Sequence, residues 1–193
     1  MPKVGMEPVR RAALVEATIA EIGTHGSLDV TVSQIARRAG VSSALAHHYF
    51  GSKEQIFLAA MRQVLTVYGT EVRAALRHAR TPRARLEAVI TAGFSPENFR
   101  HEVVAAWLNF YVLASTSTEA RRLLSVYQRR LHANLVHDLR PLVGPRAEGA
   151  AERIAGLIDG LYLRCALARR GMDGEEAAAH VAAMLEHELE AAA

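Results

Sequence analysis

The sequence predicts an all-α protein of about nine helices and no strand. Half of the 193 residues are hydrophobic and only 22% are charged, a composition that excludes wholesale disorder. Alanine is the commonest residue, and this usage favours helices over strands. Helix-capping residues and glycines that stop helices also recur at short intervals along the chain. Together these observations indicate a folded chain of helices joined by short turns.

Four helices are expected before residue 81, over residues 8–25, 31–40, 43–50 and 53–80. The first opens with a proline, and a glycine lies at or just after the end of each of the first three. Thr31 is followed three residues later by Gln34, and Ser52 in the same way by Gln55. This spacing is that of a capping box, so it marks the starts of the second and fourth helices.

Five more helices are expected after residue 80, and they begin at Thr81-Pro82, Ser95-Pro96, Thr118, Arg146 and Asp173. The third of these is expected to end at Arg140, before a loop over residues 141–145. The fourth is expected to end at Arg170, where Gly171 stops it. The fifth is expected to run to the end of the chain, because Asp173 and the glutamate three residues later have capping-box spacing.

Residues 31–42 have the spacing of a helix-turn-helix motif. The second expected helix has a face of apolar and small residues: Val32, Ile35, Ala36 and Ala39. Gly40 suits the tight turn, and Val41 suits the position that packs this turn into the core. In such a motif the second helix of the pair enters the major groove of DNA. We therefore expect a DNA-binding domain over residues 1–52, although any small helical domain can join two helices through a glycine turn.

Residues 40–54, which read GVSSALAHHYFGSKE, resemble the DNA-binding domain of the TetR family of transcriptional regulators. The resemblance covers residues 8 to 60. In that family the third helix reads DNA, and the lysine that opens the fourth helix contacts phosphate. The resemblance implies that these residues face the bases: Ser43, Ala44, Leu45, His47 and His48. It implies that a second group lies near the phosphates: Thr31, Ser33, Tyr49 and Lys53.

The expected reading helix departs from the usual chemistry of base recognition. It contains no Arg, Lys, Asn or Gln, the side chains that bind guanine or adenine through two hydrogen bonds. We expect the serine and histidines, thymine-methyl contacts and DNA shape to supply specificity. Phosphate contacts, including Arg10 and Arg11, should then dominate affinity and make it steeply salt-dependent. His47 and His48 are adjacent on a helix and point about 100° apart, so they do not predict a metal site. Protonation of these two histidines would strengthen DNA binding at low pH, because the imidazolium groups attract phosphate.

The net charge of +3 hides an asymmetry along the chain. The last 23 residues contain six acidic and no basic side chains, which leaves 23 basic and 14 acidic side chains in residues 1–170. This excess favours a polyanionic partner. The single Cys165 excludes an intrachain disulfide and a cysteine-based zinc site, and no signal-peptide core precedes the first helix. The longest uncharged run, over residues 103–118, is too short and polar to span a bilayer, so we expect a cytoplasmic protein without membrane contact.

The part of the chain after residue 52 is expected to be a helical bundle that binds an effector. Trp107, Phe110 and Tyr111 share one helix stripe, and Asp159 and Tyr162 lie close together on the face of another helix. Such residues can be ordinary core. They can also form an aromatic cage for an organic cation, whose charge the ring faces and a carboxylate attract.

Four segments resemble the choline-responsive members of the TetR family: MPKVGM at 1–6, AWLNF at 106–110, RRL at 129–131 with NL at 134–135, and LIDGL at 157–161. The resemblance implies a repressor of genes for choline uptake and for its oxidation to glycine betaine, relieved by choline or a related quaternary ammonium ion. Tyr111 and Tyr162 stand where tryptophan is expected in those relatives. The alternative is a TetR-type repressor that responds to another cationic or hydrophobic small molecule.

A homodimer that forms through the last two helices is also expected, because a two-fold operator requires a two-fold protein. Five apolar residues are candidates for that interface, or for packing within the chain: Leu157, Leu161, Val181, Met184 and Leu185. We expect no enzyme and no cofactor, since metalloprotease, phosphate-loop and nucleophile motifs are absent from the sequence. A purely structural interaction module is disfavoured by the helix-turn-helix residues.

Overall fold

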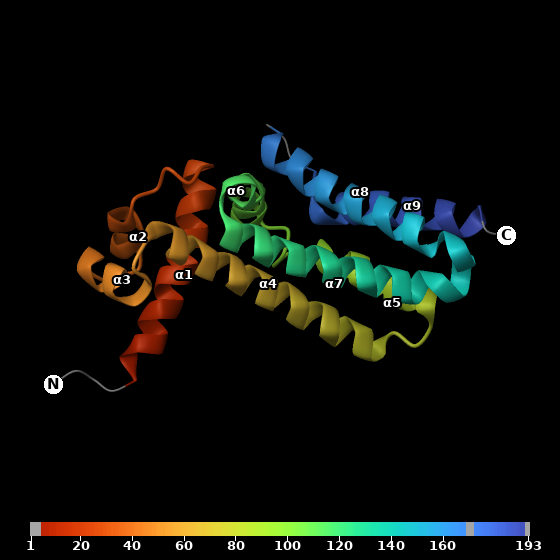
Figure 1. Cartoon of the computed structure of the whole chain (residues 1–193), viewed down its shortest axis with the longest axis horizontal. Coiled ribbons are helices and arrows are strands. Elements are labelled where there is room, and N and C mark those ends of the chain that lie inside the picture. The colour runs from red at the N-terminus through yellow and green to blue at the C-terminus, as the bar shows by residue number, and fades with distance from the viewer. Residues whose placement is uncertain (1–4, 169–171, 192–193) are drawn as a thin grey trace.

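The computed structural model describes residues 5–168 and 172–191, and this part of the chain forms nine α-helices, one 3₁₀ turn and no strand (Figure 1). The helices are α1 (Met6–His25), α2 (Val32–Arg38), α3 (Ser43–Phe50), α4 (Lys53–His78), α5 (Pro82–Gly93), α6 (His101–Thr116), α7 (Thr118–Val143), α8 (Ala147–Leu167) and α9 (Gly174–Glu190). The predicted all-α fold is therefore confirmed. The expected helix end at Arg170 and stop at Gly171 lie outside the described residues. Among the helices described, none is long and apolar enough to cross a membrane.

Helices α1 to α3 form a compact unit at one end of the molecule (Figure 1). The capping box that starts α2 is present: Thr31 accepts from the amide of Gln34, whose side chain accepts from the amide of Thr31. Gly40 adopts a left-handed φ of 67°, and the amide of Val41 donates to the Ala36 carbonyl at 3.0 Å. These bonds close the turn of the helix-turn-helix, and α2 ends at Arg38, two residues before the predicted end.

Helices α4 to α9 form the longer part of the molecule, in which α4, α7 and α8 run roughly side by side (Figure 1). Helix α4 leaves the N-terminal unit and extends along this part. Helices α8 and α9 pack on each other and on the outer side of α7. The core includes fully buried side chains from most of these helices, among them Leu58, Met61, Leu86, Phe110, Leu135 and Ile154.

The prediction that a helix begins at Ser95-Pro96 is wrong. Residues 94–100 form a short irregular segment, and α6 begins at His101. The amides of Asn98 and Phe99 donate to the Ser95 carbonyl at 3.0 and 2.8 Å, which closes one turn only. The Asn98 side chain then donates to the Ala92 carbonyl at 2.8 Å, and this contact holds the segment against α5 so that the turn does not propagate.

The predicted loop over residues 141–145 is also wrong, because α7 continues to Val143 and a 3₁₀ turn, Gly144–Arg146, follows. Pro141 lies inside the last turn of α7. It lacks an amide hydrogen, but the helix ends only two residues later, so few bonds are affected. Leu139 and Val143 are four residues apart and both buried, and their packing favours the helical conformation.

The start of α4 has half of the predicted capping box. Ser52 Oγ accepts from the amide of Gln55 at 3.2 Å, as expected. The Gln55 side chain, however, donates to Glu119 on α7 at 2.7 Å, and Arg62 on α4 donates to the same carboxylate at 2.5 Å. These bonds tie the first turns of α4 to the first turn of α7, so the sequence pattern predicted the helix start but not the long-range partner.

A close contact between α1 and α6 ties the N-terminal unit to the rest of the chain. A Cβ added to Gly23 would lie 2.8 Å from the Cα atom of Glu102, so only glycine fits at this approach. His101 Nε2 lies 3.2 Å from the Gly23 carbonyl oxygen, and Asn109 Nδ2 lies 3.4 Å from that of Gly26. The end of α1 therefore rests directly on the backbone of α6.

Gly23→Ala should destabilise the protein by about 1–3 kcal/mol, because the new methyl group meets backbone atoms that cannot rotate away. Urea unfolding followed by circular dichroism measures this change. Gly69→Ala is the control, since its Cβ would meet only the flexible end of Arg73 at 3.2 Å. Glycine is a poor helix former, so the control should gain about 0.5–1 kcal/mol. Equal effects of the two substitutions would contradict the assigned close contact.

Candidate functional site

Helix α3 presents the predicted base-facing residues on its outer side. Ala46 is fully buried and holds the helix on the unit's core. Ala44, His47 and His48 are exposed, whereas Ser43 and Leu45 are half-buried. Ser43 Oγ donates to Ser33 Oγ on α2 at 3.2 Å. His47 Nδ1 lies 3.2 Å from the carbonyl oxygen of Gly51, which leaves its other ring nitrogen free to face outward.

The residues predicted to lie near phosphates differ in their exposure and in their hydrogen-bond partners. Lys53 is exposed and its Nζ donates to the Leu28 carbonyl at 2.9 Å, so the ammonium group is accessible at the start of α4. The hydroxyl of Thr31 serves the α2 capping box. Tyr49 is half-buried, and Arg11 from α1 covers its ring at 4.9 Å from the centroid and donates to its carbonyl at 2.7 Å.

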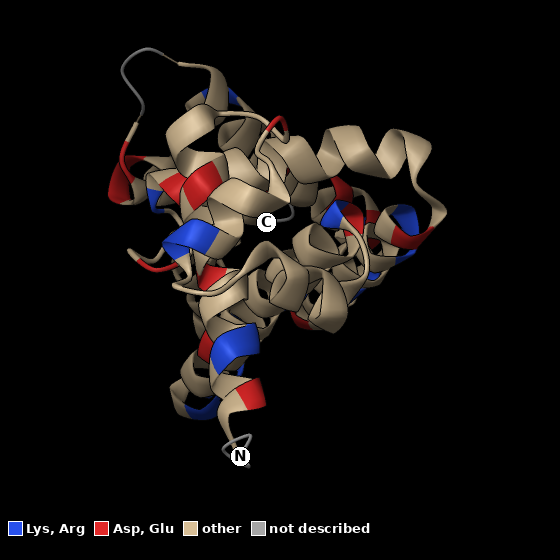
Figure 2. Cartoon of the chain, turned by 90° about the vertical axis from the view of Figure 1, so that its left-hand side faces the viewer, with Lys and Arg blue, Asp and Glu red and all other residues tan. Residues whose placement is uncertain are grey.

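The basic charge at this end is partly neutralised within the chain. Arg11 also pairs with Glu7 at 2.8 Å, and Arg38 pairs with Glu21 at 2.5 Å. Figure 2 faces this end of the molecule and shows basic and acidic segments interspersed on it. The predicted excess of basic residues therefore does not form a uniformly basic face.

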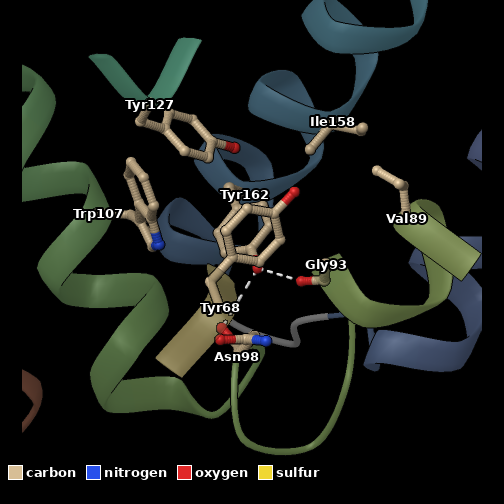
Figure 3. A pocket seen from close by; sticks show the side chains of 8 residues that line it. All are labelled: Tyr68, Val89, Gly93, Asn98, Trp107, Tyr127, Ile158 and Tyr162. Atoms are coloured by element: carbon tan, nitrogen blue, oxygen red, sulfur yellow. Dashed lines mark hydrogen bonds between the residues drawn. The ribbon is translucent and has the colours of Figure 1, made fainter. Parts of the chain in front are cut away.

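An enclosed aromatic cavity lies inside the longer part of the molecule (Figure 3). Its volume is about 10 Å³, which is room for about one water molecule. Side chains or backbone from five helices and the 94–100 segment line it: Tyr68, Val89, Gly93, Asn98, Trp107, Tyr127, Ile158 and Tyr162. The cavity thus lies where α4, α5, α6, α7 and α8 converge.

The aromatic rings around the cavity contact one another through tilted and edge-to-face geometry. The Trp107 ring lies 4.7 Å from that of Tyr127 and 6.1 Å from that of Tyr162, measured between centroids. Tyr68 lies 5.8 Å from Tyr127. Burial raises the pKa of each of these tyrosines, and the charge of Asp159 adds to the effect. Their hydroxyls therefore stay neutral and can donate hydrogen bonds.

Asp159 is a half-buried carboxylate at the edge of this aromatic cluster. The hydroxyl of Tyr111 donates to its Oδ1 atom at 3.0 Å, and the Tyr111 ring lies 5.7 Å from that of Trp107. Burial raises the pKa of Asp159, and hydrogen bonds from Tyr111 and Gln128 oppose the rise. Asp159 also lines an open groove of about 430 Å³ between α7 and α8, so it lies between the rings and the surface.

The five residues predicted for ligand binding separate in the structure. Trp107 and Tyr162 line the cavity, and Tyr111 and Asp159 adjoin it. Phe110 does not line the cavity: it is fully buried, with its ring 6.4 Å from that of Phe57 on α4 and 5.8 Å from that of Trp107. The prediction also omitted lining residues on other helices: Tyr68, Asn98 and Tyr127. Their sequence separation from Trp107 gave no signal of contact. Within the described residues, no cluster of three metal-ligating side chains occurs.

Of the five residues expected at a dimer interface or in packing within the chain, Leu161, Val181 and Leu185 are buried inside the chain, where they join α8 and α9 to the core. The other two, Leu157 and Met184, are half-buried and pack against the core. The exposed large apolar side chains of α8 are instead Leu163 and Leu167, at 42% and 68% exposure. Helix α8 therefore has an apolar face that the chain itself covers, and two leucines on the opposite side that the chain leaves exposed.

Two family descriptions match the chain. Residues 14–60 match "Bacterial regulatory proteins, tetR family", which covers α2, α3 and the start of α4. Residues 82–190 match "BetI-type transcriptional repressor, C-terminal", which covers α5 to α9 and so includes most of the cavity wall.

Individual proteins agree with these matches. The HTH-type transcriptional regulator BetI of Brucella anthropi is 52% identical over 94% of this chain and 93% of its own length. A transcriptional regulator of Pseudomonas aeruginosa PAO1 is 28% identical, with a TM-score of 0.75 over 96% of this chain and 93% of its own. A regulator of Saccharomonospora viridis, solved in complex with choline, shares the fold with a TM-score of 0.82 at 24% identity, over 94% and 97% of the two chains. The chain therefore belongs to the TetR family of transcriptional regulators, as a BetI-type repressor and not an enzyme.

Proposed function

We propose that this protein is a cytoplasmic homodimer that represses genes for choline uptake and glycine betaine synthesis and leaves its operator when choline binds. The observation that carries the proposal is the aromatic cavity with Asp159 at its edge. The curated relatives are named BetI, and a protein of the same fold holds choline, which supports this cation over other effectors.

The chemistry of the cavity suits a quaternary ammonium ion. Such an ion offers no hydrogen-bond donor at its charged end, so it is recognised by ring faces and by unscreened negative charge. Trp107, Tyr127 and Tyr162 supply the rings, and Asp159 supplies the carboxylate. The cavity of about 10 Å³ is too small for choline in this structure. Binding therefore requires part of the wall to move, and it uses the groove beside Asp159 as the route from the surface.

Operator release follows from the helix that joins the two ends of the protein. Lys53 opens α4 near the expected phosphate contacts, and Tyr68 on the same helix lines the cavity, about 22 Å further along. A cation that displaces the wall changes the position of α4 and with it that of α3. In a dimer, the two α3 helices must reach successive major grooves about 34–36 Å apart, so a small shift weakens binding. The effector acts only through its preference for the state that does not fit DNA.

The dimer is proposed to form through α8 and α9. TetR regulators bind operator DNA as dimers. Leu163 and Leu167 are exposed on the side of α8 that faces away from the core, and a second copy would cover them. This contact leaves both α3 helices at the same end of the assembly, as a two-fold operator requires.

Asp159→Asn should raise the dissociation constant for choline about tenfold or more, because the cation loses its charged partner. The ligand-free protein should be at least as stable at neutral pH, since a buried ionised carboxyl is no longer required. Calorimetric titration with choline and thermal unfolding measure the two effects. The control is Glu152→Gln, an exposed carboxylate in the same groove, which should change both far less than Asp159→Asn, because solvent screens its charge.

Choline affinity of the wild type should also fall as the pH is lowered. The cation needs ionised Asp159, and burial raises the pKa of this group, so protonation begins at a higher pH than in an ordinary aspartate. The fall should be absent from Asp159→Asn. An affinity independent of pH in the wild type would contradict the role of this carboxylate.

Lys53→Ala should weaken binding equally to the operator and to unrelated DNA, and it should reduce the salt slope by about 1, because one phosphate contact is lost. Fluorescence anisotropy over a range of salt concentrations gives both quantities. Arg77→Ala removes a positive charge from the other end of α4 and should change neither. A change in base preference with an unaltered slope would assign Lys53 to the groove instead.

Leu167→Glu should convert the dimer into a single protomer and weaken operator binding about a hundredfold, since the two half-sites would then bind independently. Analytical ultracentrifugation measures the mass. Val112→Glu is the control, because Val112 is similarly exposed, at 63%, but lies on α6. An intact Leu167→Glu dimer would place the interface elsewhere.

A further inference from the structure

The 94–100 segment is the non-helical part of the cavity wall. Asn98 from this segment is 3% exposed and lines the aromatic cavity (Figure 3). Asn98 also lines an open groove of about 210 Å³ on the other side, whose further walls come from α1, α4 and α6. The segment therefore separates the enclosed cavity from a space beside the helices of the N-terminal unit.

On the cavity side, Tyr162 holds the segment. Its hydroxyl donates to the carbonyl oxygens of Gly93 and Asn98, the latter at 3.3 Å (Figure 3). The rings of Phe94 and Phe99 lie 5.6 and 5.0 Å from the Tyr162 ring, and 5.2 Å from each other. A displacement of Tyr162 is thus transferred directly to both ends of the segment.

On the opposite side, Glu71 of α4 holds the same segment. Its Oε2 atom accepts hydrogen bonds from Ser95 Oγ at 2.7 Å and from Asn98 Nδ2 at 2.5 Å. At its end, the segment also approaches α1, where Arg100 lies 3.8 Å from Glu16. One short segment therefore contacts the cavity and both long helices of the DNA-binding end.

We propose that Glu71 is a positioning residue that transmits cavity occupancy to α4. This inference rests on the proposed function. The cavity has room for about one water molecule, so a cation must displace its wall. The helices of the wall have regular backbone bonds along their whole length, whereas the 94–100 segment has a single bonded turn and is otherwise held by side-chain bonds and ring contacts. It is the wall element that yields at least cost, and Glu71 lies about 27 Å along α4 from Lys53.

Tyr68 offers a competing route from the cavity to α4. Its ring lines the cavity and lies 5.8 Å from that of Tyr127, but its hydroxyl makes no hydrogen bond to another described residue. A displacement at Tyr68 therefore reaches α4 only through ring packing, which a small rotation of the side chain can absorb. The two bonds of Glu71 join α4 directly to the 94–100 segment, so they transmit a displacement of the segment to the helix.

The test measures the ratio of the operator affinity without choline to the operator affinity with saturating choline, by fluorescence anisotropy. For wild type this ratio should lie in the range of about 5–150. Glu71→Ala should reduce the ratio to within about twofold of one. Choline affinity of the DNA-free protein should change little, because Glu71 does not contact the cation. Glu71→Gln should restore the ratio, since its amide oxygen accepts the same two bonds.

Glu97→Ala is the matched control, because Glu97 is exposed on the same segment. It should keep the wild-type ratio. Ser95→Ala removes one of the two bonds and should give an intermediate ratio, which preserves the test if Glu71→Ala does not fold. A wild-type ratio in Glu71→Ala or Ser95→Ala, or an equal loss in Glu97→Ala, would overturn the proposal.

Two further measurements, the melting temperature and hydrogen exchange, separate a failure of this proposal from a failure of the proposed effector. If choline does not raise the melting temperature of the wild type, the proposed function is wrong, whatever the role of Glu71. Hydrogen exchange tests the contact itself without choline. In ligand-free Ser95→Ala and Glu71→Ala, the amides of residues 95–104 and those of residues 68–75 should both exchange faster than in the wild type. Faster exchange in the 95–104 region alone would show that the contact does not reach α4, and would overturn the inference.

Discussion

The continuity of α4 is the constraint on which the rest of the structure depends. This helix runs without interruption from Lys53 to His78 and takes part in both ends of the molecule. Its first turns are tied to α7 through Glu119, and its later turns carry Tyr68 to the cavity and Glu71 to the 94–100 segment. The N-terminal unit and the cavity are therefore joined by one continuous helix.

The requirement that buried polar groups be bonded explains the form of the cavity. Each ring that carries a hydroxyl brings a polar atom into an apolar space, and Tyr162 and Tyr111 meet this need by donating to Asn98 and Asp159. The same two bonds join α8 to the 94–100 segment and to α6. In the function that we propose, a cation at Asp159 would compete with the Tyr111 hydroxyl for the carboxylate.

The sequence predicted what depends on neighbouring residues and missed what depends on distant ones. Thr31 caps α2 through Gln34, three residues away, and the helix-turn-helix followed from such local patterns. Ser95 also begins a pattern typical of a helix start, but Asn98 bonds back to the Ala92 carbonyl, and both Ser95 and Asn98 bond to the distant Glu71. These contacts hold the segment in an irregular form. Tyr68 was missed as a lining residue for the same reason. A periodic pattern identifies an apolar face, but only the fold determines which element covers it, as Leu161 and Leu167 on α8 demonstrate.

The charge distribution bears on the proposed mechanism. Arg11 and Arg38 are paired within the chain, and α3 itself contains no Lys or Arg. In the mechanism that we propose, the two α3 helices of a dimer must fit the operator together, and this geometric requirement does not depend on charge. A shift of α4 would therefore weaken operator binding even where the phosphate contacts of each protomer are kept.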